Sequence, residues 1–127
     1  MQTTPRNPTD GIYRADDYLH ALEVQGTGRL LFVSGTMGLD AQGTAPETLE
    51  EQLVLVWSNL RRILAEAEMT TDNIVRLTSY LRDAAFREAN QAARLRALNG
   101  RRVPTTAIVV QTLEDDWLVE IEVIAAA

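Results

Sequence analysis

The alternation of apolar and polar residues is clearest in Trp117–Ala125, near the carboxyl end. Its odd-numbered positions are all apolar, whereas Glu120 and Glu122 stand at even-numbered positions between Leu118 and Ile124. Because a β-strand points successive side chains to opposite faces, the pattern predicts a core face and a face with two carboxylates. The flanking aliphatic residues indicate that this second face is also covered, and a covered carboxylate needs a partner or a chemical role. The alternative is a pair of glutamates on the wet face of an edge strand.

Two helices are predicted from apolar positions that recur every three or four residues. Thr44 and Glu47, with Pro46 between them, form a capping-box pattern that opens the first helix. Its apolar side consists of Leu49, Leu53, Val56, Trp57, Leu60, Ile63, Leu64 and Ala67. Asp83 is placed to cap a second helix that runs to about Leu98, before an Asn-Gly pair. The core side of this helix consists of Phe86, Ala89, Asn90, Ala93 and Ala97.

The other strands are predicted from short apolar or alternating runs. They are Tyr18–Gln25, Arg29–Ser34, Ile74–Leu81 and Thr105–Thr112. Gly-Thr-Gly joins the first two, which we expect to pair as a hairpin, and the glycine-rich residues 35–45 after them are expected to form a loop. Strict alternation in the third strand places Val75 and Leu77 on one side and Ile74 on the other.

The order of elements is thus ββαβαββ, after an irregular N-terminal arm over residues 1–12. Residues 1–127 are expected to form a single domain. Strands interrupted by two long helices are typical of an α+β sandwich with both helices on one face of the sheet. The opposite face, with Glu120 and Glu122, is then open within one chain, and we expect other copies of the chain to cover it.

Composition narrows the classes of function. Eighteen acidic and twelve basic residues give a net charge of −6, which argues against binding to nucleic acid or anionic lipid. With no cysteine and one histidine, neither thiol catalysis nor a Cys or His metal site is expected. Neither a signal peptide nor an apolar run of membrane-spanning length is visible. We therefore expect a cytoplasmic protein whose partners are small molecules or protein chains.

Polar groups among apolar neighbours are the candidates for chemistry. Glu120 could act as a general acid or base, because a carboxylate in a partly dry site can exchange protons near neutral pH. Ser34 and Gly35, at a strand end before a glycine-rich loop, could present a hydroxyl and a free backbone N–H to a ligand oxygen. An ordinary strand-to-loop turn would have the same sequence.

Three further side chains are candidates, each with a structural alternative. Asn90 interrupts the apolar side of the second helix, where a core amide that ties down a loop is the simpler explanation. Tyr18 and His20 share one face of the first strand, and the histidine is expected to be a structural hydrogen-bonding group rather than a catalytic base.

Taken together, several segments resemble the Rid superfamily, also called the YjgF or L-PSP endoribonuclease-like proteins. The resemblance runs from about Tyr18 to Ala125. It is carried by L-F-V-S-G-T at 31–36, E-E-Q-L-V-L-V-W-S-N-L at 50–60 with I-L at 63–64, D-N-I-V-R-L-T-S-Y-L-R-D at 72–83, Asn90, Pro104, and E-I-E-V-I-A at 120–125. It implies a chorismate-mutase-like fold and a homotrimer whose sheets form a central barrel, with ligand clefts between subunits.

The resemblance also implies an activity and a set of site residues. In the best-known branch of the superfamily, reactive 2-imino or enamine acids are hydrolysed to 2-keto acids and ammonia, without a cofactor. The family's binding residues fall on Tyr18, Ser34, Gly35 and Asn90, and its water-orienting glutamate falls on Glu120. Tyr18 and Trp117 are candidate walls of the pocket.

The chain departs from the family pattern at the arginine that clamps the substrate carboxylate. The motif Pro-x-Arg-Ser/Thr is Pro104-Thr105-Thr106-Ala107 here, and the usual glutamines after Ser-Gly and near the start are Thr36 and His20. Loss of a charge-assisted pair costs about 2 to 5 kcal/mol of binding. Either the substrate has no carboxylate at that end, or another arginine reaches in, such as Arg14, Arg101 or Arg102.

The leading hypothesis is a specialised Rid-like enzyme that hydrolyses or rearranges a small imine- or enamine-like intermediate other than a generic 2-imino acid. Glu120 would be the general acid or base, and the substrate-binding groups would be Tyr18, Ser34, Gly35, Thr36, Asn90, Thr106 and Trp117. The alternative is a noncatalytic trimer that binds a small metabolite or regulates through it. A ribonuclease is disfavoured by the net charge.

Overall fold

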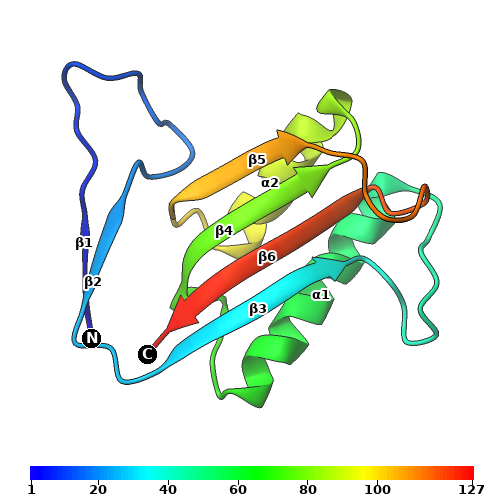
Figure 1. Ribbon diagram of the computed structural model, residues 1–127, viewed down its shortest axis with the longest axis horizontal. Coiled ribbons are helices and arrows are strands. Elements are labelled where there is room, and N and C mark those ends of the chain that lie inside the picture. The colour runs from blue at the N-terminus through cyan, green and yellow to red at the C-terminus, as the bar shows by residue number, and fades with distance from the viewer.

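The computed structural model describes residues 1–127 and contains a four-stranded sheet with two helices packed on one face (Figure 1). The strands follow the order β3 (Leu30–Met37), β6 (Val119–Ala126), β4 (Ile74–Leu81) and β5 (Thr105–Val109), and the helices are α1 (Leu49–Glu66) and α2 (Arg87–Ala97). β6 is antiparallel to both of its neighbours, whereas β5 is parallel to β4. The expected α+β arrangement, with helices on one face of a mixed sheet, is confirmed.

The core lies between the helices and the sheet, and β6 is its centre. Val119, Ile121, Val123 and Ala125 are buried, as the alternation predicts. The apolar side of α1 meets them, with Leu53, Val56, Trp57, Leu60 and Leu64 buried. Ile63, which was expected on the same side, is exposed because it lies at the edge of the packed stripe.

Helix α1 begins one turn later than predicted, with Thr48 as its N-cap. The Thr48 hydroxyl accepts a hydrogen bond from the Glu51 backbone N–H and donates one to the Glu51 carboxylate. Thr44, the predicted cap, instead donates its backbone N–H to the Asp40 carboxylate in the preceding turn. A threonine N-cap was therefore predicted correctly in type but four residues too early, and the reciprocal bond of a capping box to the N-cap backbone N–H does not form.

The N-terminal arm is irregular only after its first strand, and the predicted hairpin of β2 with β3 is wrong. Instead β1 (Gln2–Pro5) pairs with β2 (Leu22–Gln25) in a separate antiparallel ribbon beside the main sheet (Figure 1). After Gly26, which has a positive φ of 68°, the backbone N–H groups of Gly28 and Arg29 donate to the Ala127 carbonyl. These bonds direct the chain onto β6 rather than back along β2.

Two irregularities modify the strand predictions. β3 continues through Met37, so residues 35–37 belong to a strand that was expected to have ended. In β4 the pairing with β6 slips between Ile74 and Arg76, and this bulge turns Ile74 into the core, where it is fully buried. The strict alternation, which placed Ile74 opposite Leu77, cannot anticipate an extra residue.

The remaining connections are short. Thr71–Asn73 and Ala84–Phe86 form single 3-10 turns before β4 and α2, and Asp83 caps the second turn through the Ala85 N–H. α2 ends at Ala97, and Asn99 and Gly100 follow with positive φ angles. β5 ends at Val109, earlier than predicted, and β6 begins at Val119, later than predicted. Trp117 therefore lies in the connection before β6 rather than within the strand.

Gln52 links helix α1 to the start of β6. Its side chain is 1% exposed, donates to the Pro46 and Asp116 carbonyls at 2.9 and 2.7 Å, and accepts from the Leu118 N–H at 2.9 Å. One buried amide thus satisfies three backbone groups and fixes the segment that enters β6.

Replacing Gln52 by leucine should therefore lower the free energy of unfolding by about 2 kcal/mol, because three backbone groups lose a buried hydrogen-bond partner. Urea denaturation followed by circular dichroism measures this change. Gln111→Leu, at an exposed glutamine, is the control and should stay within about 0.5 kcal/mol of the wild type. Equal stability of the two variants would contradict the linking role of Gln52.

Candidate functional site

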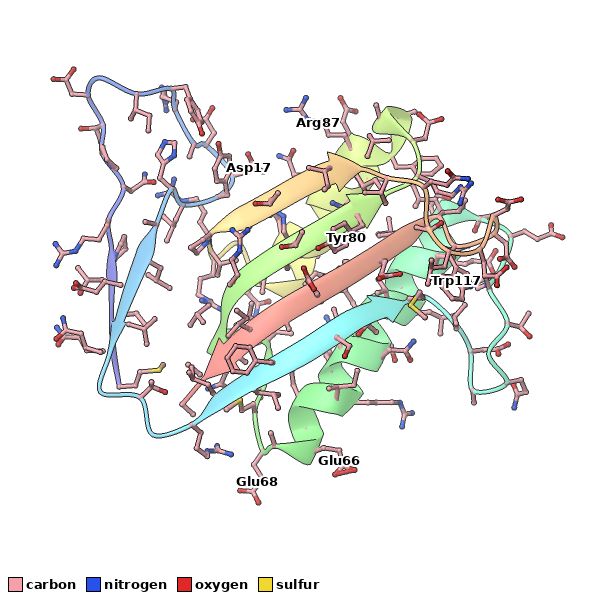
Figure 2. All side chains as sticks on the ribbon, in the orientation of Figure 1. Asp17, Glu66, Glu68, Tyr80, Arg87 and Trp117 are labelled. Atoms are coloured by element: carbon pink, nitrogen blue, oxygen red, sulfur yellow. The ribbon has the colours of Figure 1, made fainter.

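The sheet face turned away from the helices carries most of the candidate polar groups. Figure 2 shows Tyr80 standing in the middle of this open face. The Tyr80 hydroxyl donates to the Glu122 carboxylate at 2.5 Å, and the Arg76 guanidinium donates to the Thr106 hydroxyl at 2.8 Å. Glu120 on β6 lies opposite Tyr80 of β4 on one side and opposite Met37 of β3 on the other. Three strands thus contribute polar side chains to one surface.

Glu120 lies against a bulge in β3. Val33 pairs with Val123 and Thr36 pairs with Ile121, so the ladder is interrupted at Ser34 and Gly35. A bulge removes backbone groups from regular pairing, which frees them for a ligand. A Cβ at Gly35 would overlap Oε2 of Glu120 and lie 3.0 Å from its carboxylate carbon. The absence of a side chain at position 35 is therefore what leaves room for the carboxylate.

The hydrogen bond from Tyr80 to Glu122 changes the acidity of the tyrosine. Donation to a carboxylate favours the neutral phenol, so the pKa of Tyr80 is raised above its usual value, with desolvation and the charge of Glu120 adding to the effect. Tyr80 therefore keeps its proton and remains a hydrogen-bond donor to Glu122 throughout the neutral range, which holds the Glu122 carboxylate in place.

A second group of candidates surrounds a hollow at the β5 edge of the sheet. Tyr18, Asn90 and Thr106 line this hollow, whose volume is about 540 Å³. Asn90 is 3% exposed, and its side-chain oxygen has no hydrogen-bond partner. A buried amide oxygen without a partner is uncommon in native proteins. This group would accept a hydrogen bond from a ligand in the hollow.

The segment that presents Tyr18 is held by a buried ion pair. Arg94 on α2 is 3% exposed and donates to the Asp17 carbonyl at 2.8 Å and to its carboxylate at 2.5 Å. Desolvation, followed by the neighbouring Tyr13 and Asp17, raises the pKa of Tyr18 above its usual value. The neutral phenol is thus the form that faces the hollow.

His20 supports the same segment. Its ring nitrogen lies 2.8 Å from the Tyr13 carbonyl, and its backbone N–H donates to the Asn7 side chain at 2.7 Å. The rings of Tyr13 and Tyr18 both contact the imidazole edge to face. These contacts tie the N-terminal segment together.

Thr36 and Trp117 do not join either group. The Thr36 hydroxyl donates to the Ser34 carbonyl at 2.9 Å and so closes the bulge. Trp117 lies in the connection before β6, where its carbonyl accepts from the Thr112 hydroxyl at 2.7 Å. Figure 2 shows Trp117 and Asp17 at opposite ends of the sheet. Trp117 and Tyr18 therefore cannot be two walls of one pocket within a protomer.

None of the arginines proposed to replace the missing guanidinium reaches the open face. Arg14 is exposed and pairs with Asp16. Arg101 donates to the Thr71 and Ile74 carbonyls, and Arg102 donates to the Ala15 carbonyl.

The sequence prediction missed Arg76, Tyr80 and Glu122 as site residues. A signal was available, because alternation placed Arg76 and Tyr80 on the same side of β4 and Glu122 beside Glu120 on β6. What was missing was the neighbourhood of the strands, which puts these side chains next to each other and next to Thr106.

Within one protomer, Glu120 is separate from the hollow at the β5 edge, although Thr106 borders both surfaces. Glu120 is on β6 and Thr106 is on β5, with β4 between them, so their backbones are about 10 Å apart across the sheet. Tyr18 and Asn90 lie still further, beyond the β5 edge.

No cluster of three or more His, Cys, Asp or Glu side chains is placed to hold a metal ion. No helix has the length and apolar character required to cross a membrane.

Comparisons with known proteins agree on one family. A family model described as Endoribonuclease L-PSP matches residues 9–127. A RutC family protein of Aquifex aeolicus is 34% identical over 90 residues, or 69% of this chain and 66% of that protein. The RutC family protein YjgH of Escherichia coli is 40% identical over 57 residues, or 45% of this chain and 44% of that protein. Both matches span less than two thirds of the relative's length.

A solved structure extends the likeness over the full chain. The Rid family protein YyfB from Yersinia pestis, described as being of unknown function, superposes with a TM-score of 0.87. It is 28% identical in sequence, and the match covers 100% of both chains.

Gly35→Ala is expected to displace the Glu120 carboxylate while leaving the fold intact. The overlapping atoms are the far end of a flexible side chain, and position 35 does not require a positive φ. The free energy of unfolding should change by less than about 1 kcal/mol. Nitrogen–proton correlation spectra should show shifts around residues 34–37 and 119–121.

Gly28→Ala is the matched control, because a Cβ there has open space around it. It should leave the resonances around Glu120 unchanged. Loss of folding in Gly35→Ala, or unchanged resonances around Glu120, would contradict the contact.

Proposed function

The chain belongs to the Endoribonuclease L-PSP family, also known as the Rid superfamily. From this premise we propose that it is a cofactor-independent enzyme that hydrolyses or rearranges a small imine- or enamine-like intermediate. The observation that carries the proposal is the Glu120 carboxylate resting against the Ser34-Gly35 bulge. A carboxylate that can transfer protons thus lies beside a backbone segment that is not paired in the sheet. Addition of water to a carbon–nitrogen double bond requires both proton transfer and hydrogen bonds to the reacting groups.

The proposed reaction proceeds in two proton transfers through Glu120. The carboxylate accepts a proton from water as the water oxygen adds to the carbon of the protonated imine, which gives a neutral carbinolamine. The carboxylic acid then returns that proton to the nitrogen as the carbon–nitrogen bond breaks. The carbinolamine hydroxyl becomes the carbonyl oxygen and gives its proton to the departing ammonia, so ammonium and a carbonyl compound are released. In this proposal the Ser34 hydroxyl and the Gly35 N–H would bind an oxygen of the substrate or of the intermediate.

The proposal also requires a second copy of the chain over the open face. Phe32 and Ile108 on this face are 72% and 47% exposed, and β3 and β5 are unpaired at the two sheet edges. Large apolar side chains on a sheet face favour burial against another surface. A cyclic trimer would bring the β5 edge of one protomer, with Tyr18 and Asn90, to the Glu120 end of the next.

One observation favours a binding function without turnover. The hollow that contains Tyr18 and Asn90 has an unpartnered acceptor of its own and does not include Glu120. A small metabolite could bind there and regulate the trimer without any proton transfer. Ribonuclease activity, which the family description names, is disfavoured by the net charge of −6, since RNA binding depends on cationic surface.

Glu120→Gln should abolish turnover on a panel of imines and enamines generated from amino acids, measured as ammonia release. The amide cannot accept the proton of water, so we expect kcat to fall by roughly 100-fold or more. Glu114→Gln, at an exposed glutamate in the β5–β6 connection, is the matched control and should keep the wild-type rate. Full activity of Glu120→Gln on a consumed substrate would refute the mechanism, and no consumption of any panel member by the wild type would favour the binding function.

Phe32→Asp should convert the assembly into monomers, because it places a charge in the apolar contact between copies. Light scattering coupled to gel filtration measures the change from three chains to one. Val54→Asp is the control, since Val54 is 70% exposed but lies on helix α1, away from the open face. A monomeric wild type, or dissociation of both variants alike, would argue against the proposed interface.

A further inference from the structure

A groove between the two helices lies on the side of the sheet opposite to Glu120. Figure 1 shows α1 and α2 next to each other behind the sheet and running in the same direction. The groove has a volume of about 420 Å³, and seven of the ten residues that line it are hydrophobic. Sites for small molecules have volumes of roughly 300 to 1,000 Å³ and are mostly apolar. The groove therefore has the size and character of a ligand site.

The two walls of the groove differ in shape. Helix α2 contributes only alanines to the apolar lining, namely Ala89, Ala92, Ala93 and Ala97. Because an alanine side chain ends at Cβ, this wall has no protruding groups. Opposite it, α1 presents Leu53, Val54 and Trp57. A flat apolar wall facing larger side chains can accept a planar ring between them.

Trp57 carries a polar group that the chain leaves unsatisfied. Its side chain lines the groove and is 3% exposed, yet its indole N–H has no hydrogen-bond partner. A buried donor without an acceptor is uncommon in native proteins. An oxygen of a bound ligand would supply the acceptor that the chain does not provide.

Two arginines stand at one end of the groove. Arg61 lies in the second half of α1 and Arg96 in the last turn of α2, so helices that run in the same direction bring both to the same end. Neither arginine belongs to an ion pair. Glu50 also lines the groove but lies about 16 Å from Arg61 along the axis of α1. The charge complementary to this end is therefore an anion.

We propose that the groove binds a small aromatic carboxylic acid, with its ring against the alanines of α2 and its carboxylate beside Arg61 and Arg96. This inference does not rest on the proposed catalytic function, because Glu120 lies on the other side of the sheet. The groove also shares no lining residue with the hollow that contains Tyr18 and Asn90, although α2 borders both.

A small molecule fits this groove better than another protein chain. A specific protein interface involves roughly 20 to 30 residues on each side. Only ten residues line the groove, and the two charges at its rim are gathered at one end. One anionic group on an apolar body matches this distribution.

The test is a titration of the intact protein with 1-naphthylacetate and with its neutral amide, followed by nitrogen–proton correlation spectra. The chain has two tryptophans, so the indole N–H signals of Trp57 and Trp117 can be told apart. The Trp57 signal and the amides of α2 should shift, and the Trp117 signal should not. The wild type should bind the acid at least about 3-fold more tightly than the amide, because exposed arginines contribute modestly to each ion pair.

Charge variants test the end of the groove that carries the arginines. The double variant Arg61→Gln and Arg96→Gln should lose the preference for the acid and bind the amide as the wild type does. Arg62→Gln is the matched control, because Arg62 is exposed on the same helix but does not line the groove. It should keep the full preference for the acid.

A filling variant tests the alanine wall. Ala92→Leu places a larger side chain in the space of the ring and should weaken binding of both compounds by roughly 5-fold or more. Ala65→Leu, at an exposed alanine of α1 outside the groove, is its control and should bind like the wild type. Circular dichroism and light scattering should show the same fold and the same number of chains for every variant.

Four results would overturn the inference. They are an absence of binding to the wild type, shifts confined to the open sheet face or to the hollow at the β5 edge, and equal binding of acid and amide by the wild type. The fourth is a change in the number of chains caused by Ala92→Leu but not by Ala65→Leu, which would make the groove an interface between copies.

Discussion

The structure depends on a difference between the two faces of one sheet, because the helices cover one face and leave the other open. Strand β6 sends Val119, Ile121 and Val123 into the core that the helices cover, and it sends Glu120 and Glu122 to the face that they leave open. Because side chains alternate along a strand, these two sets are coupled. A shift of β6 by one residue would bury the carboxylates and expose the core, so the packing that stabilises the protein also fixes the register of the polar face.

The bulge in β3 is the second constraint, since it makes room beside β6 for the Glu120 side chain. A regular ladder would place a side chain from β3 beside each residue of β6, whereas the bulge at Ser34 and Gly35 presents a glycine there. The space that a Cβ would fill is taken by the Glu120 carboxylate. The local irregularity of β3 and the position of an acidic group on β6 are thus one structural feature, built from residues about 85 positions apart.

Sequence periodicity predicted the helices and strands whose regular spacing of residues is not interrupted by a bulge. It identified β6, β4, both helices and the covered and open faces, because alternation and helical spacing are local properties. It failed where the outcome depends on distant partners. β2 pairs with β1 although the outer edge of β3 is free, and Ile74 enters the core through a bulge that no spacing reveals. Trp117 was assigned to the pocket as part of a strand that starts only at Val119.

The candidate site was only partly predictable for the same reason. The glutamate and the Ser-Gly pair could be named from the sequence, but the meeting of Arg76 with Thr106 depends on β5 lying parallel beside β4. That register also explains why the two positions constrain each other. An arginine at position 106 would add a second positive charge to the same part of the face, where like charges repel. The threonine that stands there instead accepts from the Arg76 guanidinium at 2.8 Å and so orients the cation on the neighbouring strand.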